Sequence, residues 1–312
     1  MSRVMTVVLF VAAIAVATWG AVAFGTHRWR LATEQSMAQL QAAGSAPAIG
    51  AAPDSGGLAL PVARVATEQY AALPPAVARY FALVLAPGQP IVQHARVRHE
   101  GEFALRPNEW KPFTSRQLYS TDPRGFVWDA HIQFLPLVPM LVRDSYSIGR
   151  GSMLGALAGV VKIADVQGTE GLASGALLRY LAEAVWLPTA LLPSEGVQWT
   201  EIDGTTARAT VTDAGVTVWM DVHFGPGGSI IGVSAIRQRD VNGESVPTPW
   251  EGRFSEELLT VDGMKIPASG EVAWRLPEGK HTYWRGRVVE ATYEHRHCVP
   301  LVAAPREDAR CS

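Results

Sequence analysis

Charge is scarce in this chain, and neither sign dominates. Charged residues make up 18% of the 312 positions, and 27 basic against 29 acidic residues leave a formal net charge of −2. A protein that binds nucleic acid neutralises phosphates with a surplus of Lys and Arg. The sequence has no such surplus, so it predicts no nucleic-acid partner.

Cysteine is nearly missing, since Cys298 and Cys311 are the only two in the sequence. Outside the cytoplasm they could form one disulfide that closes a short loop, and two unpaired thiols in a frayed tail are the alternative. His295 and His297 lie beside Cys298, but no second pair of ligands accompanies them. We therefore predict no metal site.

The sequence also lacks the familiar catalytic motifs, including the Gly-x-Ser-x-Gly elbow, the Walker loop and His-Glu-x-x-His. Gly149 and Gly151 begin a glycine-rich run, but Leu154 stands where a dinucleotide loop needs its third glycine. The apolar run between Arg150 and Lys162 is too short to span a bilayer, so we expect a strand bend or a tight packing spot there. No cofactor is predicted.

What the sequence does have is an N-terminal run, from Val4 to Phe24, without a single charge. About 20 such residues span a bilayer as a helix. A cleaved signal peptide is the alternative, because Ala21 and Ala23 fit the small-x-small rule. The run is longer than a usual signal core and basic residues follow it at once, which favours an uncleaved anchor. We place this transmembrane anchor at residues 1–30, and we expect the globular domain to be extracytoplasmic.

Composition divides the remaining chain into three parts. Residues 44–57 are mostly Gly, Ala, Ser and Pro, a mixture typical of flexible linkers. We assign a flexible tether to residues 31–60, with a short polar helix over Thr33 to Ala43. One globular domain is predicted over residues 61–297, followed by a disordered tail over residues 298–312.

Apolar residues alternate with polar ones through most of the globular part. Ala95, Val97 and His99 alternate with Arg96 and Arg98, which is typical of a half-buried strand. Strand-like runs follow, many of them separated by Gly, Asn or Asp turns: 113–119, 125–133, 141–148, 197–202, 205–211, 216–224, 229–237, 252–261, 270–274 and 282–293. This many strands rarely stay flat. The sequence predicts a mainly β fold, with a large antiparallel sheet curled into a barrel or half-barrel.

Helical spacing occurs in two places. Residues 62–85 have it, and Pro74 and Pro75 divide them into two pieces. Between the strands, Leu177, Leu181 and Val185 form an apolar stripe. The concave side of the sheet is the place where a helix inserted among strands can bury such a stripe, and a partly plugged concave sheet can hold an apolar pocket.

The candidate site collects aromatic and charged residues that stand among apolar ones. Arg179 and Glu183 are four residues apart and so share one side of the helix. They form either an exposed pair or an inward-facing group in which Arg179 pairs with Asp129 or Asp144, because a buried charge needs a partner. Alternation leaves open whether Asp129 faces the concave or the convex side. The predicted ligand-binding residues are Trp128, Asp129, Asp144, Tyr146, Arg179, Tyr180, Glu183, Trp186 and Trp250.

Several blocks of sequence together resemble a bacterial family known as a domain of unknown function. They include Arg79-Tyr80-Phe81, Phe126-Val-Trp128-Asp129-Ala130, Arg179-Tyr180-Leu181-Ala182-Glu183, Trp186-x-Pro188-Thr-Ala-Leu-Leu-Pro193 and Pro249-Trp250-x-Gly252. The resemblance covers most of the chain from Leu73 to Tyr293 and implies no particular activity. More loosely, a curled antiparallel sheet with a helix on its concave side is similar to the lipoprotein-carrier (LolA/LolB-like) fold.

Three functions are compatible with these features. The first is a membrane-anchored bacterial envelope domain that binds an apolar or lipid-like ligand on the concave sheet, with Arg179 facing an anionic headgroup. The second is an anchored, hydrolase-like enzyme that uses Asp129, Asp144 and Glu183 as acid and base around Arg179. The third is an envelope scaffold, which predicts a filled interior and an exposed apolar patch.

Overall fold

A single large antiparallel sheet dominates the protein. The computed structural model describes residues 3–44, 61–241 and 244–298. Thirteen strands form the sheet, in the order β6-β5-β4-β3-β2-β1-β15-β14-β11-β10-β9-β8-β7. Their bounds are β1 (Val92–Arg106), β2 (Glu109–Thr121), β3 (Arg124–Leu135), β4 (Val138–Ser147), β5 (Arg150–Leu157), β6 (Val161–Gln167), β7 (Gln198–Asp203), β8 (Thr206–Asp213), β9 (Val216–Phe224), β10 (Ile230–Val241), β11 (Glu244–Phe254), β14 (Ser269–Leu276) and β15 (Gly279–His295). A separate hairpin consists of β12 (Leu258–Val261) and β13 (Met264–Pro267).

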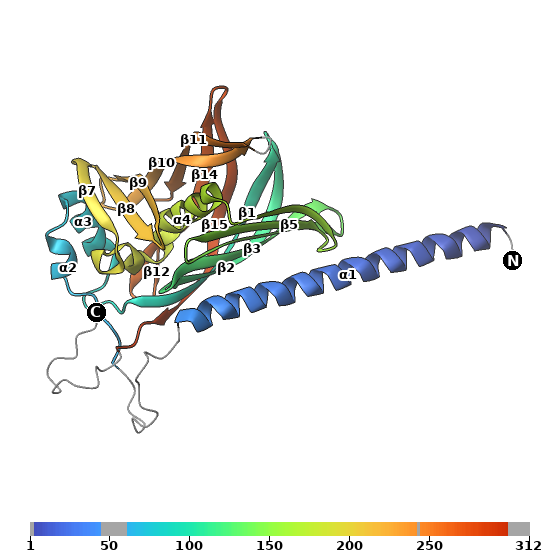
Figure 1. The fold of residues 1–312 in the computed structure, drawn as a ribbon, viewed down its shortest axis with the longest axis horizontal. Coiled ribbons are helices and arrows are strands. Elements are labelled where there is room, and N and C mark those ends of the chain that lie inside the picture. The colour runs from blue at the N-terminus through green and yellow to red at the C-terminus, as the bar shows by residue number, and fades with distance from the viewer. Residues whose placement is uncertain (1–2, 45–60, 242–243, 299–312) are drawn as a thin grey trace, which may run out of the picture.

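The sheet consists of two meanders that meet at its middle. Strands β1 to β6 follow one another on one side, and the later strands fill the other side. The first strand pairs with the last, from Val92 opposite His295 to Phe103 opposite Trp284. The sheet curls around an interior, and it stays open because β6 and β7 are its edges (Figure 1). The predicted large curled antiparallel sheet is confirmed.

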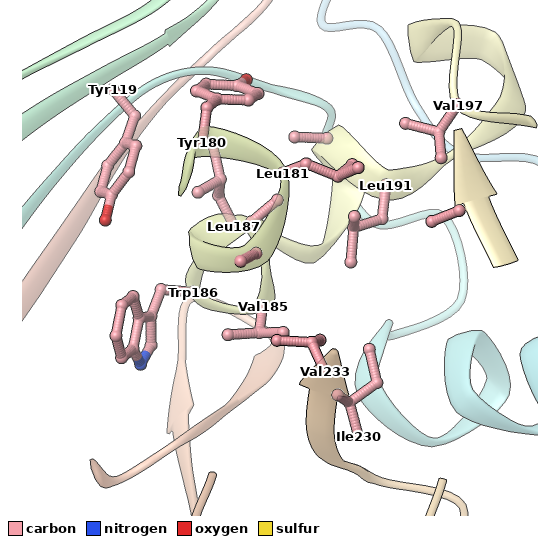
Figure 2. Close-up of a cluster of buried hydrophobic side chains, with 14 of the residues drawn as sticks. Tyr119, Tyr180, Leu181, Val185, Trp186, Leu187, Leu191, Val197, Ile230 and Val233 are labelled. Carbon is pink, nitrogen blue, oxygen red and sulfur yellow. The ribbon is translucent and has the colours of Figure 1, made fainter. Parts of the chain in front are cut away.

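Helix α4 (Glu170–Glu183) links the two meanders and lies against the concave face (Figure 1). The side chain of Thr169 caps its N-terminus by accepting a hydrogen bond of 3.2 Å from the Leu172 amide. Three short 3-10 turns continue the chain: η1 (Ala184–Trp186), η2 (Pro188–Leu191) and η3 (Pro193–Glu195). Leu181, Leu187 and Leu191 from these elements are fully buried, and they fill the interior between the two halves of the sheet (Figure 2).

Two smaller helices close the side of the domain next to β8. The proline pair separates α2 (Glu68–Ala71) from α3 (Pro75–Val84), as the sequence indicated. Pro75 occupies the first turn of α3, where its missing amide costs no hydrogen bond. Tyr80 and Phe81 point into the core.

The glycine-rich run that follows Ser147 forms a hairpin rather than a strand bend, and its glycines are the predicted tight packing spot, since Gly151 packs on Leu172 and Gly159 on Gly25. Residues 150–157 are strand β5 and residues 161–167 are strand β6, which lies at the edge of the sheet. The turn between them places Ala158 and Gly159 in the left-handed region, with φ of 52° and 68°. Small residues suit this turn because it passes very close to the N-terminal helix.

That N-terminal helix, α1 (Arg3–Gly44), is long and apolar enough to cross a membrane. It does not end with the apolar run. Thr33, Met37 and Leu40 are buried against the sheet, so residues 31–44 belong to a docked helix and not to the tether predicted for residues 31–60. Residues 45–60, and Cys311 in the predicted tail, lie outside the described residues.

Candidate functional site

A largely buried ionic group lies between α4 and the concave face. Arg179 donates from Nη1 to Asp144 Oδ2 at 2.7 Å and from Nε to Glu183 Oε1 at 2.7 Å. Glu183 also accepts hydrogen bonds from Gln117 at 2.7 Å and from the Tyr119 hydroxyl at 3.1 Å. Of the two arrangements predicted for Arg179, the structure shows the inward one, with Asp144 as partner.

Two aromatic rings complete the surroundings of Arg179. Its guanidinium carbon lies 4.6 Å from the Trp128 ring centroid and 5.0 Å from that of Phe126. The two carboxylates raise the pKa of Arg179, although burial alone would lower it. Arg179 is therefore a largely buried cation that already has two carboxylate partners and two aromatic neighbours.

Three further predicted residues belong to the packed interior. The Tyr146 hydroxyl donates to Asp213 at 2.6 Å, Tyr180 lies beneath the guanidinium of Arg124, and Trp186 donates from Nε1 to the carbonyl of Pro267 at 3.1 Å. All three side chains are buried, as is Trp128. Trp186 and Tyr180 appear in Figure 2 among the aliphatic side chains of the core.

Asp129 lies on the opposite face of the sheet from the other predicted residues. Its carboxylate accepts a hydrogen bond of 2.7 Å from Trp29 of α1 and pairs with Arg116 at 3.0 Å. Alternation explains the separation, because Trp128 faces inward and its neighbour must face outward. Asp129, one of the two acidic partners predicted for Arg179, does not pair with it. Asp129 therefore does not belong to the inner cluster.

Arg237 on β10 also faces the concave side, beside Trp250, and it was missing from the predicted site residues. Its guanidinium carbon lies 5.7 Å from the Trp250 centroid and 5.8 Å from that of Trp274, and Nη1 donates to the Tyr283 hydroxyl at 3.2 Å. The indole of Trp250 donates to the same hydroxyl at 3.0 Å. Alternation contained the signal, since Val233, Ala235 and Arg237 share one face of the strand.

Arg237 differs from Arg179 in having no acidic partner. It forms no ion pair with any of the described residues, and its Nε, buried under Gly175 of α4, has no hydrogen-bond partner among them. A cation beside aromatic rings gains some attraction from them, but a guanidinium retains unused donors here. This geometry is suited to receiving an anion.

A shallow cavity of about 970 Å³ occupies the outer face of the sheet. Its floor crosses a row of three glycines paired across neighbouring strands, Gly101, Gly286 and Gly270. The walls carry both signs of charge, including the ion pair of Glu102 with Arg285. None of the predicted site residues lines this cavity: Asp129 lies on the outer face but is covered by α1, and the other side chains face the interior.

Comparison with known proteins gives a family but no activity. Residues 63–286 match the sequence profile of a family of unknown function, DUF6544. The chain belongs to this family. No curated protein matches the DUF6544 chain. A solved structure, the crystal structure of a β-barrel-like protein of domain of unknown function DUF1849 from Brucella abortus, is 12% identical, with a TM-score of 0.18, and the match covers 65% of this chain and 99% of that one. Such a weak likeness carries no functional argument.

Proposed function

We propose that this DUF6544 protein is a membrane-anchored domain that binds an anionic, lipid-like amphiphile on the concave face of its sheet. The observation that carries the proposal is Arg237, a cation without a carboxylate partner among the described residues, set between aromatic rings. An anionic headgroup would supply the missing charge and accept the unused hydrogen bonds.

The role first predicted for Arg179 fits Arg237 better. Arg179 already has two carboxylates at 2.7 Å, so an incoming anion would have to displace one of them and leave it buried and unpaired. Arg237 carries no such penalty. Asp144 and Glu183 are likewise both engaged by Arg179, which gives the alternative of an acid–base enzyme less support.

The surroundings of Arg237 favour an amphiphile over a small free anion. Trp274, Tyr283 and Phe103 are half-buried and pack beside the core, so they offer apolar contact next to the charge. Tyr283 and Trp274 stack at 5.9 Å. A helix able to cross a membrane is part of the same chain, which would keep the domain beside a reservoir of lipid.

The test compares two arginine variants of the full chain purified in mild detergent. Arg237→Gln removes the proposed headgroup contact, and Arg208→Gln removes an arginine that also stacks on a tryptophan, at 3.7 Å, but is paired with Asp221. A charge-assisted hydrogen bond contributes about 1.5–3 kcal/mol, so losing it should weaken binding about tenfold or more.

Native mass spectrometry with lipid extraction gives the readout. We expect an anionic lipid of defined mass on the unmodified chain and on Arg208→Gln, and its loss from Arg237→Gln. An empty unmodified chain, or equal retention by both variants, would refute the proposal.

A further inference from the structure

The sheet exposes large apolar side chains at the end that lies beside α1. The β3–β4 turn carries Leu135 and Leu137, and the β5–β6 turn carries Val160 and Val161. Leu137 is 85% exposed and has a φ of 64°. A leucine rarely adopts this left-handed backbone, and a group of exposed apolar side chains is typical of a surface that contacts a membrane or another protein. The two turns that carry these four residues are called the apolar turns below.

The β5–β6 turn lies at the level where the apolar part of α1 ends, and the β3–β4 turn adjoins it, because the Ala158 amide donates to the Pro139 carbonyl at 2.7 Å. A side chain added to Gly25 would overlap the carbonyl oxygen of Ala158, and one added to Gly159 would overlap the carbonyl oxygen of Gly25. The β5–β6 turn therefore touches the helix immediately after Phe24. In Figure 1 the hairpin ends lie beside α1, and the helix continues past them toward its N-terminus.

The length of the apolar segment fixes where a bilayer would begin. Val4 to Phe24 rise about 30 Å at 1.5 Å per residue, which matches the hydrocarbon core of a bilayer. Arg28 and Arg30 follow within two turns of helix, where lipid headgroups would lie. A membrane that covers this segment thus reaches the apolar turns as well.

We propose that both apolar turns insert into the surface of the same bilayer that α1 spans, so that the domain sits on the membrane at a fixed orientation. This proposal rests on the anchoring part of the proposed function and not on ligand binding at Arg237. The lipid supplies the apolar surroundings that Leu137 and Val160 lack in the protein. Three points of attachment would hold the sheet against the bilayer where a single helix would let it swivel.

The experiment places a fluorophore at one turn at a time in the full chain. The variants Leu137→Cys and Val160→Cys are labelled with an environment-sensitive dye and reconstituted into bilayers of phosphatidylcholine and phosphatidylglycerol. Ile148→Cys is the matched control, because Ile148 is also exposed and left-handed, with a φ of 47°, but it lies in the β4–β5 turn at the other end of β4. The unsubstituted chain, treated identically, corrects for background labelling.

Quenching by lipids that carry a nitroxide on the acyl chain is the readout. We expect at least twofold quenching at positions 137 and 160 and none at 148. Quenching at neither turn, or at only one of them, in a chain that floats with the vesicles would overturn this proposal and leave the anchor and the ligand site standing. A chain that does not float would overturn both the anchor and the insertion.

Discussion

At the residue scale, Arg179 shows how strongly a buried charge depends on its partners. Replacing it in Arg179→Met would keep much of the apolar stem but leave Asp144 and Glu183 buried without a cation. We expect a loss of about 3–5 kcal/mol in the free energy of unfolding. Urea unfolding of the full chain in detergent, followed by tryptophan fluorescence, measures it.

The control for that variant is Arg208→Met, whose ion pair with Asp221 is partly exposed. Exposed pairs contribute about 0–1 kcal/mol, so this variant should unfold almost like the unmodified chain. Equal losses in the two variants would show that the Arg179 group is not a buried ionic centre.

His99 predicts a pH dependence of stability. Burial, together with the positive charge of Arg179, lowers the pKa of His99 to about 3. In the unfolded chain the pKa of His99 is about 6.5. As the pH falls below 6.5, His99 therefore binds a proton in the unfolded chain but stays neutral in the folded one. The contribution of neutral His99 to the free energy of unfolding is therefore complete above pH 6.5 and is lost as the pH decreases toward 3.

The measurement compares the unmodified chain with His99→Gln between pH 7.5 and pH 5. We expect the unmodified chain to lose about 2 kcal/mol more of its unfolding free energy than the variant over this interval. Other titrating groups affect both proteins alike and cancel in the difference. Parallel stability curves would mean that His99 accepts a proton in the folded state.

At the element scale, one hydrogen bond tests the docking of α1. Asp129 is 1% exposed, and Trp29 donates to it while its ring stacks on Arg143 at 4.7 Å. Trp29→Phe keeps a ring but removes the donor, which should cost about 1–3 kcal/mol because a buried carboxylate loses a partner. Faster amide hydrogen exchange over residues 31–44 should report the loosened helix.

A matched substitution in the same helix is Trp19→Phe, since Trp19 lies in the apolar segment and its side chain is 70% exposed. Amide hydrogen exchange over residues 31–44 should be as slow in Trp19→Phe as in the unmodified chain. If Trp29→Phe exchanged no faster, the helix would be held by its apolar residues alone.

The periodicity of the sequence predicted most elements but not how they face one another. The alternation around Val97 and the stripe of Leu177 and Leu181 identified β1 and α4, because each period is a local property. Whether Asp129 lies inside or outside depends on the direction in which the sheet curls, which is a property of the whole sheet. The sequence likewise predicted a helix over Met37 and Leu40, but no feature of the neighbouring residues indicated that one face of the sheet would cover them.

At the scale of the whole molecule, the aromatic residues in the sequence did not distinguish a ligand pocket from a filled core. Trp128, Tyr180, Trp186 and Trp250 were predicted to line a pocket, and all four are buried in the core. Large rings suit both a ligand cavity and a filled interior, and only the packing around them separates the two cases. The lipoprotein-carrier likeness and the extracytoplasmic location stay predictions for the same reason, since neither has a local signature.

The second half of α1 is docked on the sheet and so belongs to the folded domain, and this gives a final prediction from two truncated chains. A chain that begins at Gly25 loses the apolar segment but keeps Trp29, Met37 and Leu40 on the sheet. A chain that begins after Gly44 also uncovers Leu118 and loses more than about 3 kcal/mol, since burying each large apolar side chain contributes about 1.5–3 kcal/mol.

Thermal unfolding separates the two truncated chains. For a domain of this size each kcal/mol shifts Tm by about 2–4 °C, so the shorter chain should melt about 10 °C below the chain that begins at Gly25. Equal Tm values would mean that residues 25–44 only tether the domain. A large difference would show that the helix which is long and apolar enough to cross a membrane is also a structural part of the β domain, joined to the sheet through Asp129 and Arg143.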